Sequence, residues 1–420
     1  MKKILAIVLA NAAFLAVTSG SPYAGHTDAE EKTVRHSHDH THSDKHISHK
    51  EGQTPLSFGG IAFGFGATMV IQGTSGNSDN AGKTDTTGGG YSTDFEITVP
   101  FGENGTAFSL IDSGTGGEGV DTQLGTFQAV NGDANPADDA IAITEIWYEQ
   151  TALNSLFTFT FGQLDLSNYF DGNEVANDET SQFLGAPFVN GTVINFPDPF
   201  GLGFRLTFSP LDLVDFTIAW QENGDDEAPW DDLFGEAVWM GEVAVRPSFA
   251  GLQGNYRLFG WTDSSAHTKW KDVGTGTCGD VTISATEWKC QNNAGIGVSV
   301  DQQITGPLAA FFRFSTRDEE LSKFDTNLSG GLALSGEMWG RGSDTVGAGY
   351  SVSSLSDKYK NSSSSTADEK SSESHLEIYY NAQLNDNFSI SPDLQFVTGG
   401  DGADSFEDVW VFGVRTQLFF

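Results

Sequence analysis

Histidines near the N-terminus form the densest group of side chains that could do chemistry. Seven of the nine histidines lie between His26 and His49, and the most closely spaced are His36, His38, His40, His42, His46 and His49. Neutral imidazole rings are ligands for Zn, Cu and Ni, and alternate spacing can bring several rings to one ion. No apolar period runs through this segment, so we expect a polar, disordered tail. Metal capture and a solvated spacer are both open hypotheses for it.

A second group consists of charged residues placed singly between apolar neighbours, as in Phe312-Arg313-Phe314. Successive side chains of a β-strand point to opposite faces, so each charge faces away from the apolar residues beside it. The group comprises Arg205, Arg246, Arg257, Arg313, Arg415, Glu145, Glu377 and Asp393. If they face one interior, these residues would line a polar channel and set an electric field across it. The alternative is that they pair with one another and hydrate the wall.

Acidic residues gather in the segment 164–200, which contains no lysine or arginine. Asp165, Asp171, Glu174 and Asp178 are four of them. At the narrow part of a channel, carboxylates would attract cations and repel anions. An ordinary solvated surface loop is the other interpretation.

Cys278 and Cys290 are the two cysteines of the chain. In an exported protein, two nearby cysteines are expected to form one disulfide, which here would close a small loop. A zinc or redox site is the weaker alternative, because two thiols without a nearby histidine make a poor zinc site.

The first residues predict that the chain is exported. Lys2 and Lys3 precede an apolar stretch from Ile4 to Val17, and small residues follow it. This order is typical of a secretory signal peptide, which we place at residues 1–24. The apolar stretch is shorter than the ~20 residues that a membrane-spanning helix needs. The expected organisation is therefore a signal peptide, a histidine-rich tail at 25–54 and one domain at 55–420.

Alternating apolar and polar residues fill the chain from Thr54 onward, as in Phe157-Thr158-Phe159-Thr160-Phe161. This period of two is typical of strands with one apolar and one polar face. Sixteen such strands are predicted, starting near residues 58, 91, 106, 143, 155, 201, 213, 236, 252, 294, 308, 328, 343, 373, 387 and 408. An even number of strands suits a bacterial outer-membrane barrel.

Short and long connections alternate between these segments. The short ones lie around residues 100–104, 152–154, 209–210, 247–248, 306–307 and 384–386, and long ones include 113–142, 164–200 and 263–292. An antiparallel transmembrane β-barrel with short periplasmic turns and long extracellular loops predicts this alternation, whereas a soluble sandwich does not. The expected fold is therefore an all-β barrel of about sixteen strands in the bacterial outer membrane, in contact with lipid and lipopolysaccharide.

The charge and the motifs exclude two classes of protein. With 21 basic and 57 acidic residues the formal net charge is −36, so binding of nucleic-acid phosphates by a basic surface is excluded. Hydrolase, zinc-protease and phosphate-binding motifs are missing, so the chain is not expected to be an enzyme or to need a cofactor beyond metal on the tail. A structural or adhesive barrel with a blocked interior remains an alternative.

Two stretches resemble the OprB-type carbohydrate-selective porin family. The first runs from Phe161-Gly162-Gln163-Leu164-Asp165 through Tyr169-Phe170-Asp171-Gly172-Asn173 to Phe188-Val189-Asn190. The second contains Leu376-Glu377-Ile378-Tyr379-Tyr380 and Ser391-Pro392-Asp393-Leu394-Gln395-Phe396. The resemblance implies a sixteen-stranded porin, expected to be a homotrimer, for passive entry of small polar solutes, which are sugars in the named members. It also implies that the third long loop, 164–200, folds inward and narrows the channel.

Two functions therefore remain open. The first is a porin for sugars or other small polar solutes. The second is a cation-preferring pore whose histidine tail captures divalent Zn, Cu or Ni, motivated by the net charge and the clustered histidines.

Overall fold

The computed structural model describes residues 56–80, 82–115, 119–133, 141–197, 201–223, 236–267, 269–270, 291–362, 371–403 and 405–420. The predicted signal peptide and histidine tail lie outside the described residues, and so do Cys278 and Cys290. The predictions for these segments therefore stay predictions.

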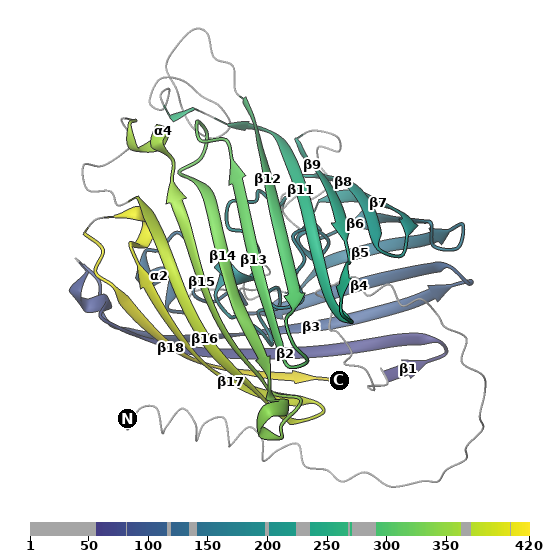
Figure 1. The fold of residues 1–420 in the computed structure, drawn as a ribbon, viewed down its shortest axis with the longest axis horizontal. Helices are drawn as coiled ribbons and strands as arrows, with labels where there is room; N and C mark the ends of the chain where they lie inside the picture. The colour runs from purple at the N-terminus through teal and green to yellow at the C-terminus, as the bar shows by residue number, and fades with distance from the viewer. Residues whose placement is uncertain are drawn as a thin grey trace. The chain divides into compact units, whose positions relative to one another are not determined.

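Sixteen antiparallel strands form the wall of a closed barrel (Figure 1). They are β2 (Ile61–Ser75), β3 (Thr87–Phe101), β4 (Gly105–Gly114), β5 (Ile141–Ala152), β6 (Phe157–Gln163), β7 (Leu202–Leu211), β8 (Val214–Glu222), β9 (Ala237–Val245), β11 (Leu252–His267), β12 (Gln291–Gln303), β13 (Leu308–Arg317), β14 (Phe324–Ser335), β15 (Thr345–Leu355), β16 (Ser372–Asn385), β17 (Phe388–Thr398) and β18 (Val409–Phe419). Two short segments, β1 (Leu56–Phe58) and β10 (Ser248–Phe249), form small hairpins with β2 and β11. The predicted fold class and strand number are confirmed.

The last strand closes the barrel by pairing with the first. Residues of β18 from Trp410 to Phe419 lie opposite residues of β2 from Ser75 to Gly66. Phe65 and Phe420 continue this ladder, with N–H···O=C distances of 3.1 and 2.9 Å in the two directions. Because every wall strand then has two neighbours, the wall leaves no unpaired edge.

Alternation along each strand sorts the side chains between the two faces of the wall. In β13, Phe312 and Phe314 are 46% and 37% exposed on the outside, whereas Arg313 between them is 1% exposed. The same alternation separates Trp410 and Phe412 from Val411 in β18. The outside is thus apolar and the inside carries the polar residues, as expected for a barrel in lipid.

The register shifts at several places in the wall, and two of these irregularities bear on the predictions. In β5, Leu110 of β4 lies opposite Glu145 while Ile111 lies opposite Ile143, so Thr144 is an extra residue and the strand bulges. Thr144 and Glu145 are consequently both buried on the inside. The second irregularity lies at Ser209-Pro210, where we predicted a turn; β7 instead continues to Leu211 through a break in register. Proline has no N–H for the ladder, so it fits such a break.

Aromatic rings lie flat against glycines on the inner face of the wall. A Cβ atom added to Gly347 would lie 2.1 Å from the Tyr379 ring, and one added to Gly295 would lie 2.0 Å from Trp261. Each ring and its glycine are direct partners on neighbouring strands. The glycine removes the side chain that would otherwise hold the ring away from the wall.

The helices that the structure describes are short and lie in the connections between strands. They include α2 (Asp121–Leu124), α3 (Ala186–Val189) and α4 (Asp357–Lys360). Among the helices that the structure describes, none has the length and apolar character needed to cross a bilayer.

Replacing Gly347 by valine should destabilise the barrel, because the new side chain would occupy the space of the Tyr379 ring. We expect a loss of about 1–3 kcal/mol in the free energy of unfolding, the usual cost of overpacking. Urea unfolding in detergent micelles measures it. Gly306→Ala is the matched control, because nothing lies within 4 Å of its added Cβ. Equal unfolding midpoints for the two variants would contradict the packing described above.

Candidate functional site in the barrel interior

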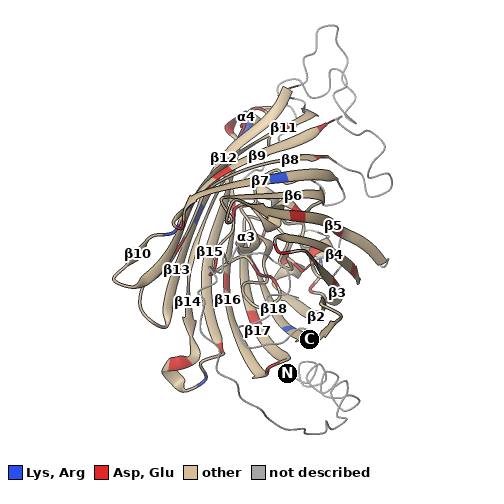
Figure 2. Cartoon of the chain, turned by 90° about the vertical axis from the view of Figure 1, so that its right-hand side faces the viewer, with Lys and Arg blue, Asp and Glu red and all other residues tan. Residues whose placement is uncertain are grey.

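The connection between β6 and β7, residues 164–197, passes through the interior of the barrel. Its backbone and side chains contact the inner faces of β5, β9, β12, β13, β16 and β18, which lie around the whole wall. A loop on the outside could not reach these inward side chains. In Figure 2, α3 lies within the ring of strands, in agreement with these contacts. We call residues 164–197 the inner loop.

Arg313 of β13 holds the two halves of the inner loop together. Its guanidinium donates to the carbonyls of Phe188 (2.8 Å) and Asp171 (2.9 Å) and to the side-chain oxygen of Asn177 (2.6 Å). It also forms an ion pair with the Asp171 carboxylate at 3.2 Å. Both side chains are 1% exposed, so their charges compensate each other away from water.

Asp171 is fixed by the loop as well as by Arg313. Its carboxylate accepts a hydrogen bond from the Gly191 N–H at 2.7 Å, which links the start of the loop to its end. Its backbone has a φ of 59°, a left-handed conformation that is uncommon for residues other than glycine. Burial raises the pKa of Asp171, and the Arg313 charge and the Gly191 N–H lower it in part.

Glu377 of β16 binds the tip of the inner loop. Its two oxygens accept hydrogen bonds from the backbone N–H groups of Leu184 (2.6 Å) and Gly185 (2.8 Å). Gly185 permits this approach, because a Cβ atom there would lie 2.7 Å from the carboxylate. Nearby, Asp393 of β17 accepts a hydrogen bond from Gln395 at 2.9 Å. Glu377 is thus a loop anchor, which its inward position alone did not reveal.

Arg415 of β18 binds the inner loop just before its tip, at Glu179 and Gln182. Its guanidinium donates to the carbonyls of Glu179 and Gln182 (2.8 Å) and to the Ser391 hydroxyl (3.1 Å). It is 1% exposed. Arginine satisfies several carbonyls at once because its planar group carries five donors.

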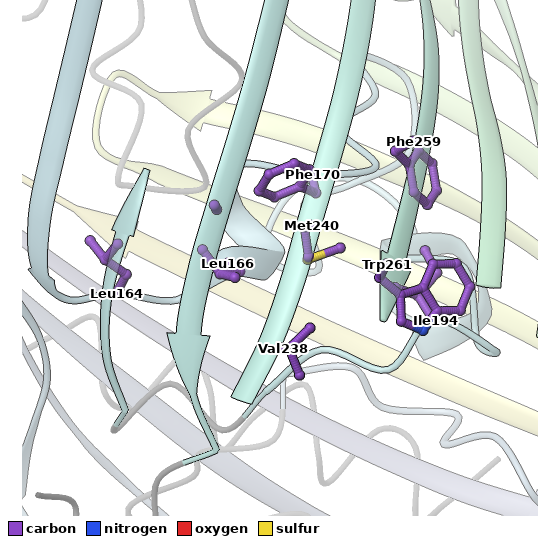
Figure 3. Packing of buried hydrophobic residues seen from close by; sticks show 9 residues of the cluster. Leu164, Leu166, Phe170, Ile194, Val238, Met240, Phe259 and Trp261 are labelled. Carbon is purple, nitrogen blue, oxygen red and sulfur yellow. The ribbon is translucent and has the colours of Figure 1, made fainter. Parts of the chain in front are cut away.

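Apolar side chains attach the start of the inner loop to β9 and β11, across the barrel from β18 (Figure 3). Leu164, Leu166 and Phe170 of the loop form one buried cluster with inward residues of β9 and β11. Those strands contribute Val238, Met240, Phe259 and Trp261. The interior is therefore not lined by polar residues everywhere, and its apolar part is covered by the loop.

A second connection, residues 119–133 between β4 and β5, also lies against the interior. The N–H groups of Phe127 (2.7 Å) and Gln128 (2.9 Å) bind the two oxygens of Glu373 on β16. It is joined to the inner loop by backbone hydrogen bonds, Gly132 N–H to the Leu184 carbonyl at 2.6 Å and Ala186 N–H to the Ala129 carbonyl at 3.1 Å. We call residues 119–133 the second loop.

The predictions from sequence missed the second loop and Glu373. The available signals were weak: Val120, Leu124 and Val130 are apolar residues in a polar segment, and Glu373 begins a strand in the inward register. In the structure, the three apolar residues pack with Val397 and Val411 of β17 and β18.

The remaining arginines of the predicted group each pair with a carboxylate. Arg205 binds Glu149 at 2.7 Å and lies 4.0 Å from the centre of the Tyr169 ring. Arg257 binds Asp301 at 3.1 Å, and Arg246, just after β9, binds Asp215. The partner acids Asp215 and Asp301 were not predicted, although the same alternation places them inside.

Carboxylates dominate the wall formed by β3, β4 and β5. Asp94 and Asp112 lie directly opposite each other on β3 and β4, and Asp112 accepts a hydrogen bond from Thr144. Glu145 accepts hydrogen bonds from Asn168 (2.9 Å) and Trp147 (3.1 Å). Among the residues that the structure describes, no lysine or arginine forms an ion pair with Asp94 or Asp112. Acidic side chains therefore outnumber basic ones on this side of the interior.

The four acids predicted in segment 164–200 have different environments. Asp165 accepts a hydrogen bond from the Ser167 N–H at 2.8 Å, and Asp178 accepts one from the Thr180 N–H at 2.8 Å, so both cap local turns. Asp171 is held by Arg313. Glu174 is exposed to solvent, and its N–H donates to Asp301 at 3.3 Å. Their attraction of ions at a constriction remains a prediction.

Within the residues that the structure describes, no three histidine, cysteine or carboxylate side chains are grouped so that they could hold a metal ion. The tail histidines from His36 to His49 lie outside the described residues.

A closed barrel of sixteen strands with a connection folded into its interior defines an outer-membrane porin. The chain belongs to one porin family in particular: the family model described as carbohydrate-selective porin, OprB family, matches residues 80–420. The predicted family and the bacterial outer membrane as location are thereby confirmed.

Solved outer-membrane channels share this fold. The high-pH structure of OprB from Pseudomonas putida superimposes with a TM-score of 0.74 at 17% sequence identity, covering 86% of this chain and 94% of that chain. The outer membrane channel DcaP of Acinetobacter baumannii gives a TM-score of 0.50 at 10% identity, covering 88% of this chain and all of that chain. A comparison with curated protein sequences finds no match.

Replacing Arg313 by alanine should release the inner loop and raise the single-channel conductance. The change leaves Asp171 buried without its partner, which costs about 3–5 kcal/mol for a buried ion pair. Conductance in planar bilayers measures the result. Arg341→Ala is the control, because its ion pair with Asp344 lies in the β14–β15 turn, away from the loop. Unchanged conductance and current noise in Arg313→Ala would count against the anchoring role.

Ionisation of Asp133 at the end of the second loop should weaken the fold as the pH rises. Burial raises the pKa of Asp133 to about 8, although the Ser92 hydroxyl donates to it at 2.8 Å. The unfolded chain ionises this group near pH ~4, so the folded state holds the extra proton. The free energy of unfolding therefore falls as the pH rises from about 4 through about 8.

Asp133→Asn removes this dependence, and its advantage over the natural chain should grow between pH 5 and pH 8 and then level off. Urea midpoints at pH 5, 7 and 9 measure it. Glu103→Gln, in the exposed β3–β4 turn, is the control. A difference that does not vary with pH would show that Asp133 is not buried as described.

Proposed function

We propose that small neutral sugars are the solutes that diffuse through this outer-membrane porin. The observation that carries the proposal is a set of polar and aromatic side chains beside the inner loop. Arg205 and Glu149 form an ion pair, the half-buried Tyr169 ring lies 4.0 Å from the Arg205 guanidinium, and the half-buried Trp147 stands two residues before Glu149 on the same face of β5. Donors, acceptors and flat apolar faces together match a sugar, which has hydroxyl groups around an apolar ring face.

The pairing of the interior arginines favours a neutral solute over an anion. Arg205, Arg246, Arg257 and Arg313 are each paired with a carboxylate, and Arg415 is bound to loop carbonyls. Guanidinium groups paired in this way present little net positive charge to a solute. The family description, a carbohydrate-selective porin, agrees with this proposal.

A cation-preferring pore is the second candidate, and the β3–β5 wall is the observation that favours it. Asp94 and Asp112 lie opposite each other on the inner face without a described basic partner, so acidic side chains prevail on this wall. Cations would be drawn along this wall. Divalent metal capture by His36, His38, His40, His42, His46 and His49 is a separate proposal, which rests on the sequence alone. A homotrimer is likewise proposed from the family.

Single-channel recording of the purified chain tests both candidates. Millimolar glucose or maltose should block the current stepwise if sugars bind inside, and the reversal potential in a KCl gradient should be small. Trp147→Ala should weaken the block severalfold, because the ring beside the Arg205–Glu149 pair is lost. Trp339→Ala, in the β14–β15 turn, is the matched control and should leave the block unchanged.

The opposite result would favour the cation-preferring pore over the sugar channel. A strongly cation-selective reversal potential without any effect of sugar would retire the sugar proposal. Asp94→Asn combined with Asp112→Asn should then shift the potential toward zero. Adding Zn²⁺ to the natural chain and to a chain without residues 25–54 tests the tail separately, since only the natural chain should respond.

A further inference from the structure

Arg205 of β7 is an isolated base in the part of the wall that runs from β3 to β9. Between Lys83 and Arg246 the sequence contains no other lysine or arginine. Acids are frequent in the same stretch, and Asp112 and Glu145 are two of those on the inner face. A solute that moves along these strands therefore meets many carboxylates and a single guanidinium group.

The guanidinium group of Arg205 is occupied and covered. Its Nη2 atom donates to the Glu149 carboxylate at 2.7 Å and to the Thr160 hydroxyl at 3.1 Å. The Tyr169 ring lies 4.0 Å from its central carbon, and only 4% of the Arg205 side chain is exposed. This base therefore offers little surface and little net charge to a solute.

Glu149 is the accessible member of the ion pair, because its side chain is 25% exposed. Its Oε2 atom accepts hydrogen bonds from Arg205 at 2.7 Å and from the Thr160 hydroxyl at 2.9 Å. Within the part of the chain that the structure describes, its other oxygen, Oε1, accepts no hydrogen bond. Arg205 and Thr160 thus fix a carboxylate that keeps one oxygen for a solute.

Trp147 provides an aromatic ring on the same face of the wall. It stands two residues before Glu149 in β5, so both side chains point to the interior. Its ring stacks on Phe108 of β4 with 4.9 Å between the ring centroids, and its indole N–H donates to Glu145 at 3.1 Å. The ring is held in place and half-buried. The face of an indole attracts an ammonium group as well as the apolar face of a sugar.

Threonine hydroxyls adjoin the ion pair on the inner face. Thr106 of β4 is the direct partner of Glu149, and Thr158 of β6 and Thr217 of β8 lie in the inward rows of their strands. All three are half-buried. Hydroxyl groups both donate and accept hydrogen bonds, so they suit sugar hydroxyls whatever the charge of the sugar. Discrimination by charge therefore depends on Glu149 and the ring of Trp147.

We propose that this pore binds amino sugars more tightly than neutral sugars and excludes acidic sugars, with Glu149 accepting a hydrogen bond from the ammonium group. The inference rests on the proposed function, because it concerns the same sugar site, and it adds the charge of the preferred solute. A protonated amino sugar keeps the hydroxyl groups and the apolar ring face of a neutral sugar. It adds a cation, which binds a carboxylate through a charge-assisted hydrogen bond.

Acidic sugars are disfavoured by the same arrangement. A uronic acid or a sugar phosphate brings negative charge to a wall on which carboxylates prevail. The base that could receive this charge, Arg205, is already paired with Glu149.

Single-channel recording of the full chain tests the inference with glucose, glucosamine, N-acetylglucosamine and glucuronate at constant ionic strength. The pH is about 6, below the usual pKa of an amine. Glucosamine should block the current at a severalfold lower concentration than glucose. N-acetylglucosamine keeps the ring but carries no charge, so it should behave like glucose. Glucuronate should not block.

Glu149→Gln is the decisive variant, because it removes the carboxylate and leaves Arg205 without its counter-charge. The preference for glucosamine over glucose should vanish, and glucuronate should now block. Glu103→Gln, which removes an exposed acid in the β3–β4 turn, is the matched control and should keep the order of the natural chain. If Glu149→Gln does not fold, the double variant Glu149→Gln with Arg205→Met replaces it. That variant should be blocked no better by glucosamine than by glucose, and glucuronate should not block it.

The outcomes separate this inference from the proposed function. Equal block of the natural chain by glucosamine and glucose would overturn the inference and leave the sugar proposal standing. No block by any of these sugars would overturn both. Block by methylammonium at the same concentration as glucosamine would overturn the inference, because the pore would then select the charge alone. A glucosamine preference that persists in Glu149→Gln would also overturn it, because other acids would then attract the ammonium group.

Discussion

Complete pairing of backbone hydrogen bonds is the constraint on which this structure depends. Hydrocarbon offers no partner for an unpaired N–H or C=O group, so the sheet must close, and it does so between β18 and β2. Closure divides every strand into an outward and an inward row. The outward row becomes apolar, and all residues that could bind a solute are confined to the inward row and to the connections that enter the barrel.

Most charged side chains in the interior bind the two connections that enter the barrel and so hold them in place. Arg313 and Arg415 bind carbonyls of the inner loop, while Glu373 and Glu377 bind backbone N–H groups of the two loops. Such buried charges add little net stability compared with apolar residues, but they define one arrangement of the loops. On the β3–β5 wall, Glu145 likewise binds Asn168 of the inner loop, whereas Asp94 and Asp112 lie opposite each other on neighbouring strands and add to the acidic character of the remaining space.

The sequence was enough to predict most of the wall but only part of the site. Alternation of side chains predicted the strands and placed Arg313, Glu377 and Arg415 inside, because a period of two follows directly from strand geometry. It could not show that these residues bind the loops, since their partners are backbone groups that any sequence has. The bulge at Thr144 and the register break at Pro210 depend on pairing between strands. The second loop was missed because its contacts with Gln72, Glu373 and Gln395 come from distant parts of the chain.

The anchoring of the inner loop has a consequence for the order of assembly. Residues 164–197 are made before β9 to β18, yet their partners Arg313, Glu377 and Arg415 belong to those later strands. The loop therefore cannot dock until the last strands are in the wall. Until then the interior charges are hydrated, so closure of the wall need not bury them. Docking of the loop and expulsion of water from around these charges would then be the final, slow step of folding, because it joins the most distant parts of the chain.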